Sequence, residues 1–233
     1  MTAENVTAPA TLRPGVRTYK PRRSRITEVQ SAALTVDDGL LLARPDRPLP
    51  DGPLDLTALF GTGTPVVLEI GFGTGDPAAQ VIADNPSTGY LAVDIHTPGV
   101  GDLLHRLREL GATNARVLEA DALVVLERHV SPHSLTAVRA LFPDPWPKAR
   151  HHKRRLVQPA VLDLIRSRLV PGGTWHLATD WPEYAEAMVE CFAADPQWFG
   201  GPVPRPSWRV PTRYERRALR EGRTSTDLQF RTH

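Results

Sequence analysis

The sequence contains one cysteine, no long apolar run and no apolar stretch near its first residue. A single cysteine, Cys191, cannot form a disulfide within the chain, which is typical of a reducing compartment. No segment approaches the roughly 18 consecutive apolar residues of a membrane-spanning helix. The opening residues, MTAENVTAPATLRP, lack the apolar core of a secretory signal. We therefore expect a cytoplasmic protein with no membrane partner, and we assign Cys191 no catalytic role.

The small net charge of +2 conceals three strongly basic windows. Residues 13–25, 148–155 and 205–223 hold 18 of the 28 Lys and Arg residues but only 2 of the 26 Asp and Glu residues. The rest of the chain keeps ten basic against 24 acidic residues, so it is acidic. Phosphates require local cationic potential rather than a high average charge. The windows favour a nucleic-acid partner over three solvated charge runs, but they do not say which nucleic acid.

The order of apolar patterns predicts an arm, a short N-terminal region and one large domain. Residues 1–30 are charged and without period, so we expect a flexible basic arm. Residues 31–64 form an N-terminal region with a proline-rich linker, and 65–233 form the domain. Strand patterns at 65–70, 89–95, 115–121, 136–142 and 174–180 alternate with helical patterns at 76–86, 99–112, about 122–130, 155–173 and 181–195. This alternation predicts a Rossmann-like α/β fold, a doubly wound, mostly parallel sheet with helices on both faces.

Three glycines follow the first predicted strand, at Gly71, Gly73 and Gly75. Their spacing lacks the register of the dinucleotide fingerprint, and Glu69 just before them would repel a pyrophosphate. Asp94 and Asp121 end the next two strands, where carboxylates can accept from ribose hydroxyls and an adenine amino group. S-adenosylmethionine carries an ammonium, a ribose and an adenine but no phosphate, so we expect it as the cofactor. A plain tight turn and a nicotinamide cofactor are the alternatives.

The segment FPDPWPKARHHKRRL (142–156) follows the fourth predicted strand. Three prolines within residues 143–147 stiffen this loop, so Asp144 would be held beside the reactive methyl group. Trp146 would offer a stacking face to a base. Phosphates would then meet Arg150, His151, His152, Lys153, Arg154 and Arg155. The alternative is a rigid turn before a charged helix. The histidines lack the spacing of a metal site, so we expect no metal.

This segment resembles the signature of the bacterial tRNA (guanine-N7-)-methyltransferases. LEIGFGTGD, DIHTPGVG, LEADA, ATDWPEYAEAM and PTRYERRALREG are similar to that family in order and spacing. The resemblance covers roughly residues 15–30 and 65–233. It implies an S-adenosylmethionine-dependent enzyme that methylates N7 of a guanine in the variable loop of tRNA.

Carried over by position, the resemblance implies a set of site residues. Cofactor contacts would fall on Glu69, Asp94, Asp121 and Asp144, with Asp144 also the active-site residue. Substrate contacts would fall on Lys148, Asp180, Thr212, Arg213, Tyr214 and Glu215, and RNA contacts on residues 150–155. Two positions depart from the family: Asp94 stands where glutamate is usual, and Tyr214 where phenylalanine is common. The shorter Asp94 side chain would need a shifted ribose or a bridging water.

Three other functions compete with this interpretation. A nicotinamide-dependent oxidoreductase would need a glycine register and a catalytic pair that the sequence lacks. An RNA-binding module that merely kept the fold would tolerate loss of the glycines or of Asp144, and both are intact. A methyltransferase for another RNA or a small molecule is the third, and a small molecule would leave the basic windows idle. Whether the protein is a monomer or a homodimer stays open.

Overall fold

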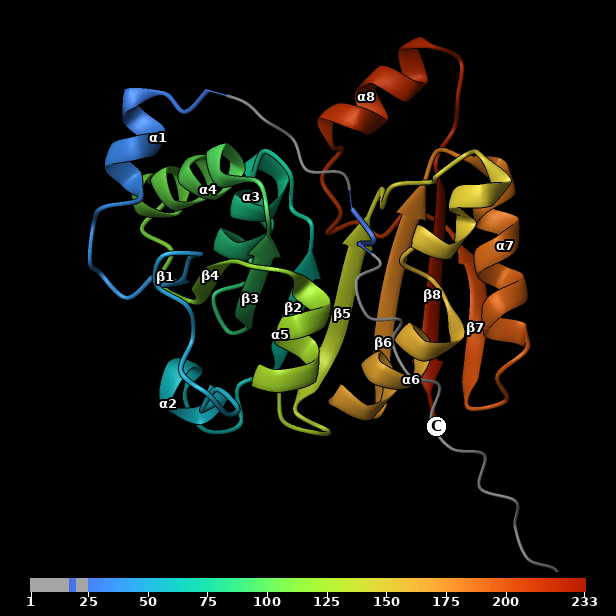
Figure 1. Cartoon of the computed structure of the whole chain (residues 1–233), viewed down its shortest axis with the longest axis horizontal. Coiled ribbons are helices and arrows are strands. Elements are labelled where there is room, and N and C mark those ends of the chain that lie inside the picture. The colour runs from blue at the N-terminus through green and yellow to red at the C-terminus, as the bar shows by residue number, and fades with distance from the viewer. Residues whose placement is uncertain (1–16, 20–24) are drawn as a thin grey trace, which may run out of the picture.

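The computed structural model of the chain describes residues 17–19 and 25–233. It contains an eight-stranded sheet with the order β1-β4-β3-β2-β5-β6-β8-β7 (Figure 1). Most of the predicted arm, residues 1–16 and 20–24, lies outside the described residues. The strands are β1 (Leu41–Ala43), β2 (Val66–Ile70), β3 (Gly89–Asp94), β4 (Ala115–Glu119), β5 (Leu135–Leu141), β6 (Leu169–Thr179), β7 (Trp198–Val203) and β8 (Thr226–Thr232). Strands β1 to β6 pair in parallel, and β8 runs antiparallel to both β6 and β7.

Helices cover both faces of the sheet, as the alternation of patterns predicted. The helices are α1 (Glu28–Ala33), α2 (Leu56–Phe60), α3 (Asp76–Ala83), α4 (Thr97–Glu109), α5 (Ala122–His129), α6 (Pro159–Arg168), α7 (Pro182–Ala193) and α8 (Arg213–Arg220), with a 3-10 turn η1 (Ala149–Arg154). One apolar core packs α5, α6 and α7 against the sheet. A second packs α1, α3 and α4 against the opposite face. The predicted doubly wound α/β fold is confirmed.

The central strands are apolar along their whole length because both faces are covered. Every residue of β3 is buried, and so are the first four of β2. Strand β8, which we did not predict, instead alternates, with Leu228, Phe230 and Thr232 buried. Phe230 stacks on Phe192 of α7 with ring centroids 3.6 Å apart. This contact joins the C-terminal strands to the core of the domain.

The predicted helix at 155–173 is wrong at both ends. Its first four residues, 155–158, form a loop after η1, and α6 begins at Pro159 and ends at Arg168. Pro171, Gly172 and Gly173 lie inside β6 and do not stop a helix. The register against β5 shifts between Leu135 and Ala137, and Gly172 has a φ of 72°. The Pro-Gly-Gly sequence therefore forms an irregularity in a strand, which local propensity does not distinguish from a helix stop.

The order of the strands creates a crevice at one end of the sheet. From β2 the chain adds β3 and β4 on one side, and it then returns to place β5 on the other side of β2. The connections after β2 and β5 therefore leave the sheet in opposite directions, and open α/β sheets bind ligands at such a switch point. The glycines, the strand-end acids and the proline-rich loop all follow strands that end at this edge.

Candidate functional site

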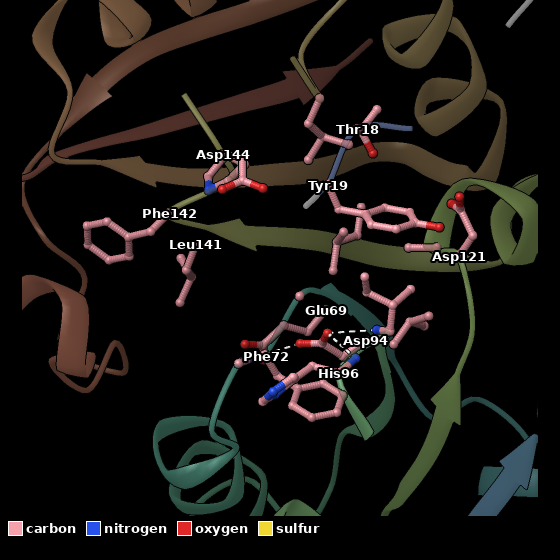
Figure 2. A pocket seen from close by; sticks show the side chains of 18 of the residues that line it. Thr18, Tyr19, Glu69, Phe72, Asp94, His96, Asp121, Leu141, Phe142 and Asp144 are labelled. Atoms are coloured by element: carbon pink, nitrogen blue, oxygen red, sulfur yellow. Dashed lines mark hydrogen bonds between the residues drawn. The ribbon is translucent and has the colours of Figure 1, made fainter. Parts of the chain in front are cut away.

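A cavity of about 200 Å³ lies at this edge, beyond the ends of β2, β3, β4 and β5. Its lining brings together Glu69, Gly71, Gly73, Asp94, Asp121, Asp144 and Thr212, all of which the sequence analysis singled out. In Figure 2 Asp144 and Thr18 lie on one side, and Glu69 and Asp94 lie on the other. Among the side chains that the structure describes, four carboxylates and no Lys or Arg line the cavity. Such a lining suits a ligand that carries positive charge and no phosphate.

The glycine loop turns sharply because its backbone enters the left-handed region. Gly71, Gly73 and Gly75 have φ values of 74°, 66° and 77°, which other residues adopt only with strain. The loop is also packed from behind: a methyl group at Gly75 would lie 2.7 Å from Cβ of Leu103. One at Gly99, in the first turn of α4, would overlap the carbonyl oxygen of Gly73. Helix α4 therefore rests directly on the loop that borders the cavity.

Asp94 fastens the glycine loop to the end of β3. Its Oδ2 accepts from the backbone N–H of Gly73 at 2.8 Å, and its Oδ1 accepts from those of Ile95 and His96 at 2.7 and 3.0 Å. Burial raises the pKa of the Asp94 carboxyl, and these three bonds oppose that rise. A carboxylate has about four acceptor positions, so little capacity remains for a ligand. The aspartate thus shapes the loop as well as facing the cavity.

Glu69 is the most deeply placed acid of the cavity. Its side chain is 7% exposed, and among the described residues no donor forms a hydrogen bond with its carboxylate. Burial raises the pKa of Glu69, the Arg139 guanidinium lowers it, and Asp94 raises it. A buried carboxylate without a donor gains most from a ligand that brings its own cationic hydrogens. Glu69 is therefore suited to hold an ammonium group.

Asp121 begins α5 and lies at the cavity wall. Its Oδ1 accepts from the backbone N–H of Leu123 at 2.9 Å, which caps the helix. In Figure 2 the ring of Tyr19 extends from the other wall toward Asp121. Burial and the nearby Asp121 both raise the pKa of the Tyr19 hydroxyl.

The proline-rich loop holds Asp144 through a strained backbone. Phe142 and Trp146 have φ values of 56° and 45°, a left-handed conformation that costs non-glycine residues about 1–3 kcal/mol each. The N–H of Phe142 donates to the carbonyl of Ala178 on β6 at 2.7 Å, which anchors the start of the loop. Asp144 is half-buried and faces the cavity between these two positions. The three prolines, two positive φ values and this hydrogen bond fix the backbone path of the loop in the structure.

The expectation that Trp146 stacks on a base is wrong for this structure. The side chain is 3% exposed, and the Arg154 guanidinium lies over its ring, 3.7 Å from the centroid. The indole Nε1 donates to the carbonyl of Thr18 at 3.3 Å. Arg154 also donates to the carbonyls of Arg17 and Tyr19, at 3.1 and 3.4 Å. Trp146 and Arg154 therefore bind residues 17–19, and neither face of the Trp146 ring is open to a base.

The predicted phosphate-contacting residues divide into two groups. Lys148, Arg150 and Lys153 are exposed on η1 and just before it, and His151 and His152 are half-buried. Arg155 is only 5% exposed and donates to both oxygens of Glu183, at 3.0 and 2.5 Å. Its Nε also donates to the carbonyl of Pro145 at 2.9 Å. Arg155 thus supports the loop that carries Asp144, and its donors face the protein.

The C-terminal substrate residues are divided in the same way. Thr212 lines the cavity, and its Oγ1 accepts from the N–H of Glu215 at 3.1 Å. The Glu215 side chain is buried, where it accepts from Arg209 twice at 2.8 Å. Asp180 forms an ion pair with Arg223. Arg213 and Tyr214 begin α8. Glu215 therefore orients the start of α8 from inside, and Thr212 borders the cavity.

Two lining residues, Thr18 and Tyr19, escaped the sequence analysis. Both come from the predicted arm, and the contacts that hold their segment run to backbone carbonyls. Every residue type carries that carbonyl, so no side-chain pattern could reveal the contact. In the part of the chain that the structure describes, no three His, Cys, Asp or Glu side chains are placed to hold a metal ion. No helix there is long and apolar enough to cross a membrane.

The chain is similar to known methyltransferases. A family model described as "Putative methyltransferase" matches residues 63–228. The chain is 47% identical over 221 residues to a tRNA (guanine-N(7)-)-methyltransferase of Streptomyces avermitilis, covering 93% of this chain and 75% of that protein. It is 44% identical over 229 residues to one of Thiobacillus denitrificans, covering 97% and 99% of the two chains.

Solved structures support the fold at much lower sequence identity. A 16S rRNA (adenine(1408)-N(1))-methyltransferase from Catenulisporales acidiphilia with its cosubstrate SAM superposes with a TM-score of 0.53 at 19% identity, over 76% of this chain and 87% of that one. This likeness shows the Rossmann-like fold of class I methyltransferases. Because the curated relatives match nearly the whole chain at such high identity, the chain belongs to the tRNA (guanine-N(7)-)-methyltransferase family.

Proposed function

We propose that this protein transfers a methyl group from S-adenosylmethionine to N7 of a guanine in the variable loop of tRNA. The relatives named above supply the reaction. The observation that carries the proposal is the cavity itself, with two buried carboxylates at its base and Asp144 on a stiff loop at its side. Cationic side chains, Lys148, Arg150 and Lys153, lie close by along the chain and are exposed to solvent.

The acids of the cavity fit the polar groups of S-adenosylmethionine. Glu69 would hold the ammonium group, and Asp94 would use its remaining acceptor capacity for a ribose hydroxyl. Asp121, at the wall beside α5, would accept from the adenine amino group. When bound, S-adenosylmethionine supplies an activated methyl group. The absence of described Lys and Arg from the lining favours this ligand over a dinucleotide, whose pyrophosphate needs donors and positive charge.

The reaction needs orientation more than proton transfer. N7 of guanine already carries a lone pair, so no base must remove a proton before it attacks. Asp144 would accept from the N1 and N2 hydrogens of guanine and turn N7 toward the methyl group. Its negative charge would also favour the cationic ring that forms. Because the strained loop holds Asp144 before guanine arrives, little reorganisation is needed on binding.

The tRNA backbone would meet the exposed members of the basic windows. Lys148, Arg150 and Lys153 are free of the ion pairs that occupy Arg155. We therefore assign Arg155 and Glu215 to positioning the loop and helix that border the site. Asp180 would act on guanine from another side only after release from Arg223.

The test is methyl transfer to unmodified tRNA with radiolabelled S-adenosylmethionine, followed by mapping of alkali-sensitive 7-methylguanosine. Asp144→Asn should lower kcat/KM by about 10- to 150-fold, the value of a hydrogen bond to a charged group. The cofactor Kd should stay nearly constant. Asp51→Asn, at an exposed site far from the cavity, is the matched control. Near-normal turnover of Asp144→Asn would remove Asp144 from its role, and label in a base other than guanine would refute the proposed reaction.

A further inference from the structure

A row of polar side chains crosses one face of the sheet beneath the cavity. In the register of the parallel strands, Glu69 of β2 is paired with Arg139 of β5, and Arg139 with His176 of β6. Paired residues on adjacent strands project to the same face, so these three side chains are neighbours. The sequence analysis gave Arg139 no role, and the proposed reaction does not use it. Its position beside the deepest acid of the cavity is therefore unexplained.

Arg139 is held by aromatic groups on two sides. Its Nη1 donates to the hydroxyl of Tyr90 at 3.2 Å, and its guanidinium lies 5.4 Å from the centroid of that ring. On the other side its guanidinium stacks on Trp208 at 3.7 Å from the centroid. Trp208 also contacts His176, with ring centroids 5.2 Å apart. A planar guanidinium clamped in this way presents a fixed charge rather than a mobile one.

The C-terminal segment provides the clamp. Trp208 is followed directly by Arg209, whose side chain is 1% exposed. Arg209 joins two buried acids, Glu215 on α8 and Asp227 on β8, with contacts of 2.8 and 2.7 Å. The Nε2 of His176 donates to Oδ1 of Asp227 at 2.9 Å. The position of Trp208 over Arg139 is therefore fixed by an ion network that reaches both C-terminal elements.

The charge of Glu69 depends on few neighbours. Arg139 faces it from β5 and Asp94 and Tyr90 face it from β3, while His96 acts on the neighbouring Asp94. Arg139 is the cation whose effect opposes the burial of Glu69. The ammonium group of the cofactor requires a charged carboxylate there, because a protonated one offers far weaker attraction.

We infer that Arg139 is a positioning residue for the cofactor: its fixed positive charge beside Glu69 keeps that carboxylate charged for the ammonium group, and Trp208 of the C-terminal segment clamps the Arg139 guanidinium in place. The inference rests on the proposed use of S-adenosylmethionine. It assigns to this strand a role in cofactor affinity that acts through Glu69 and not through contact with the ligand.

The test compares two ligands by calorimetry between pH 6 and 9. S-adenosylmethionine carries the ammonium group, and 5′-methylthioadenosine has the same adenosine without it. Arg139→Met should weaken S-adenosylmethionine binding by up to about tenfold at the low end of this pH range, the largest effect of one pKa unit on Glu69. The weakening should grow as pH falls, and 5′-methylthioadenosine should bind as it does to the wild type. Arg139→Lys, which keeps the charge but not the plane, should recover part of the affinity.

Arg116→Met is the matched control, because Arg116 also lies on a central strand with its guanidinium over an aromatic ring, Phe60, but away from the cavity. It should change neither Kd. Equal Kd values for wild type and Arg139→Met across the pH range would overturn the inference, and so would parallel losses for both ligands, which indicate a general structural role. A wild-type protein that does not bind S-adenosylmethionine would overturn the proposed function as well, so the two failures are distinguishable.

Discussion

A methyl group added at Gly99 should damage the cofactor site without touching the cofactor. Gly99 lies in the first turn of α4, where an added Cβ would overlap the carbonyl oxygen of Gly73 and approach Nδ1 of His96 to 3.2 Å. The carbonyl oxygen of Gly73 is a backbone atom, so it cannot swing away as the end of a flexible side chain could. In Gly99→Ala, either α4 or the glycine loop must move.

Two opposing terms decide the size of the effect on stability. Overpacking of this kind costs about 1–3 kcal/mol, and the better helix propensity of alanine returns up to about 1 kcal/mol. A net loss of about 1–2 kcal/mol corresponds to a fall in Tm of about 2–8 °C in a domain of this size. The displaced loop also carries the N–H that binds Asp94. Misplacement of site atoms by about 1 Å can cost 100-fold, so we expect the Kd for S-adenosylmethionine to rise about 10- to 100-fold.

The assay pairs calorimetric ligand binding with thermal unfolding. Gly201→Ala serves as the control, because nothing lies within 4 Å of the Cβ that it would add and its φ is ordinary. That variant should keep its Kd and gain up to about 1 kcal/mol of stability. If Gly99→Ala matched the wild type in both Kd and Tm, the contact between α4 and the glycine loop would not shape the site, and the reasoning would fail.

Further expectations concern charge. Burial raises the folded-state pKa of Glu69 above its unfolded value, so its ionised form opposes folding at neutral pH. Glu69→Gln should therefore raise Tm by a few degrees near pH 8, and by less as pH falls, while it abolishes cofactor binding. A lower Tm would contradict this. Arg209→Met should cost about 3–5 kcal/mol in urea unfolding, since it removes from two buried acids the arginine that bonds to both of them. An unchanged midpoint would disprove the network's importance. Lys153→Ala should reduce the salt dependence of tRNA binding by about one phosphate contact at constant Tm, whereas Arg155→Ala should lower Tm; identical behaviour of the two variants would refute their separation.

Much of the fold was predictable because its signals are local. Buried parallel strands produce continuous apolar runs such as VVLEI and YLAV, and glycines and acids mark their ends. Topology then brings Glu69, Asp94, Asp121 and Asp144 to one cavity, which a list of strand ends anticipates. Strand β1 was missed because it is only three residues long, and β7 and β8 because they carry glycines, a proline or charges among few apolar residues.

The partners of charged residues were not predictable. Arg155 and Lys153 stand two positions apart with the same sign, yet one is buried against Glu183 and the other is exposed. The partner lies 28 residues away, so no local pattern separates them. Glu215 is a similar case, since its burial depends on Arg209 and Ser225. Sequence shows where charge is concentrated, and packing decides which charges are available.

The hydrogen bonds from Trp146 and Arg154 to residues 17–19 affect how sequences can diverge within the family. Both side chains donate hydrogen bonds to backbone carbonyls, so a substitution within residues 17–19 would rarely remove these bonds. Substitution of Trp146 or Arg154 would remove them whatever the sequence of that segment. Selection should therefore act on Trp146 and Arg154 more strongly than on residues 17–19. Homologous N-terminal segments would then drift apart in composition while still following the same path along the wall of the cavity.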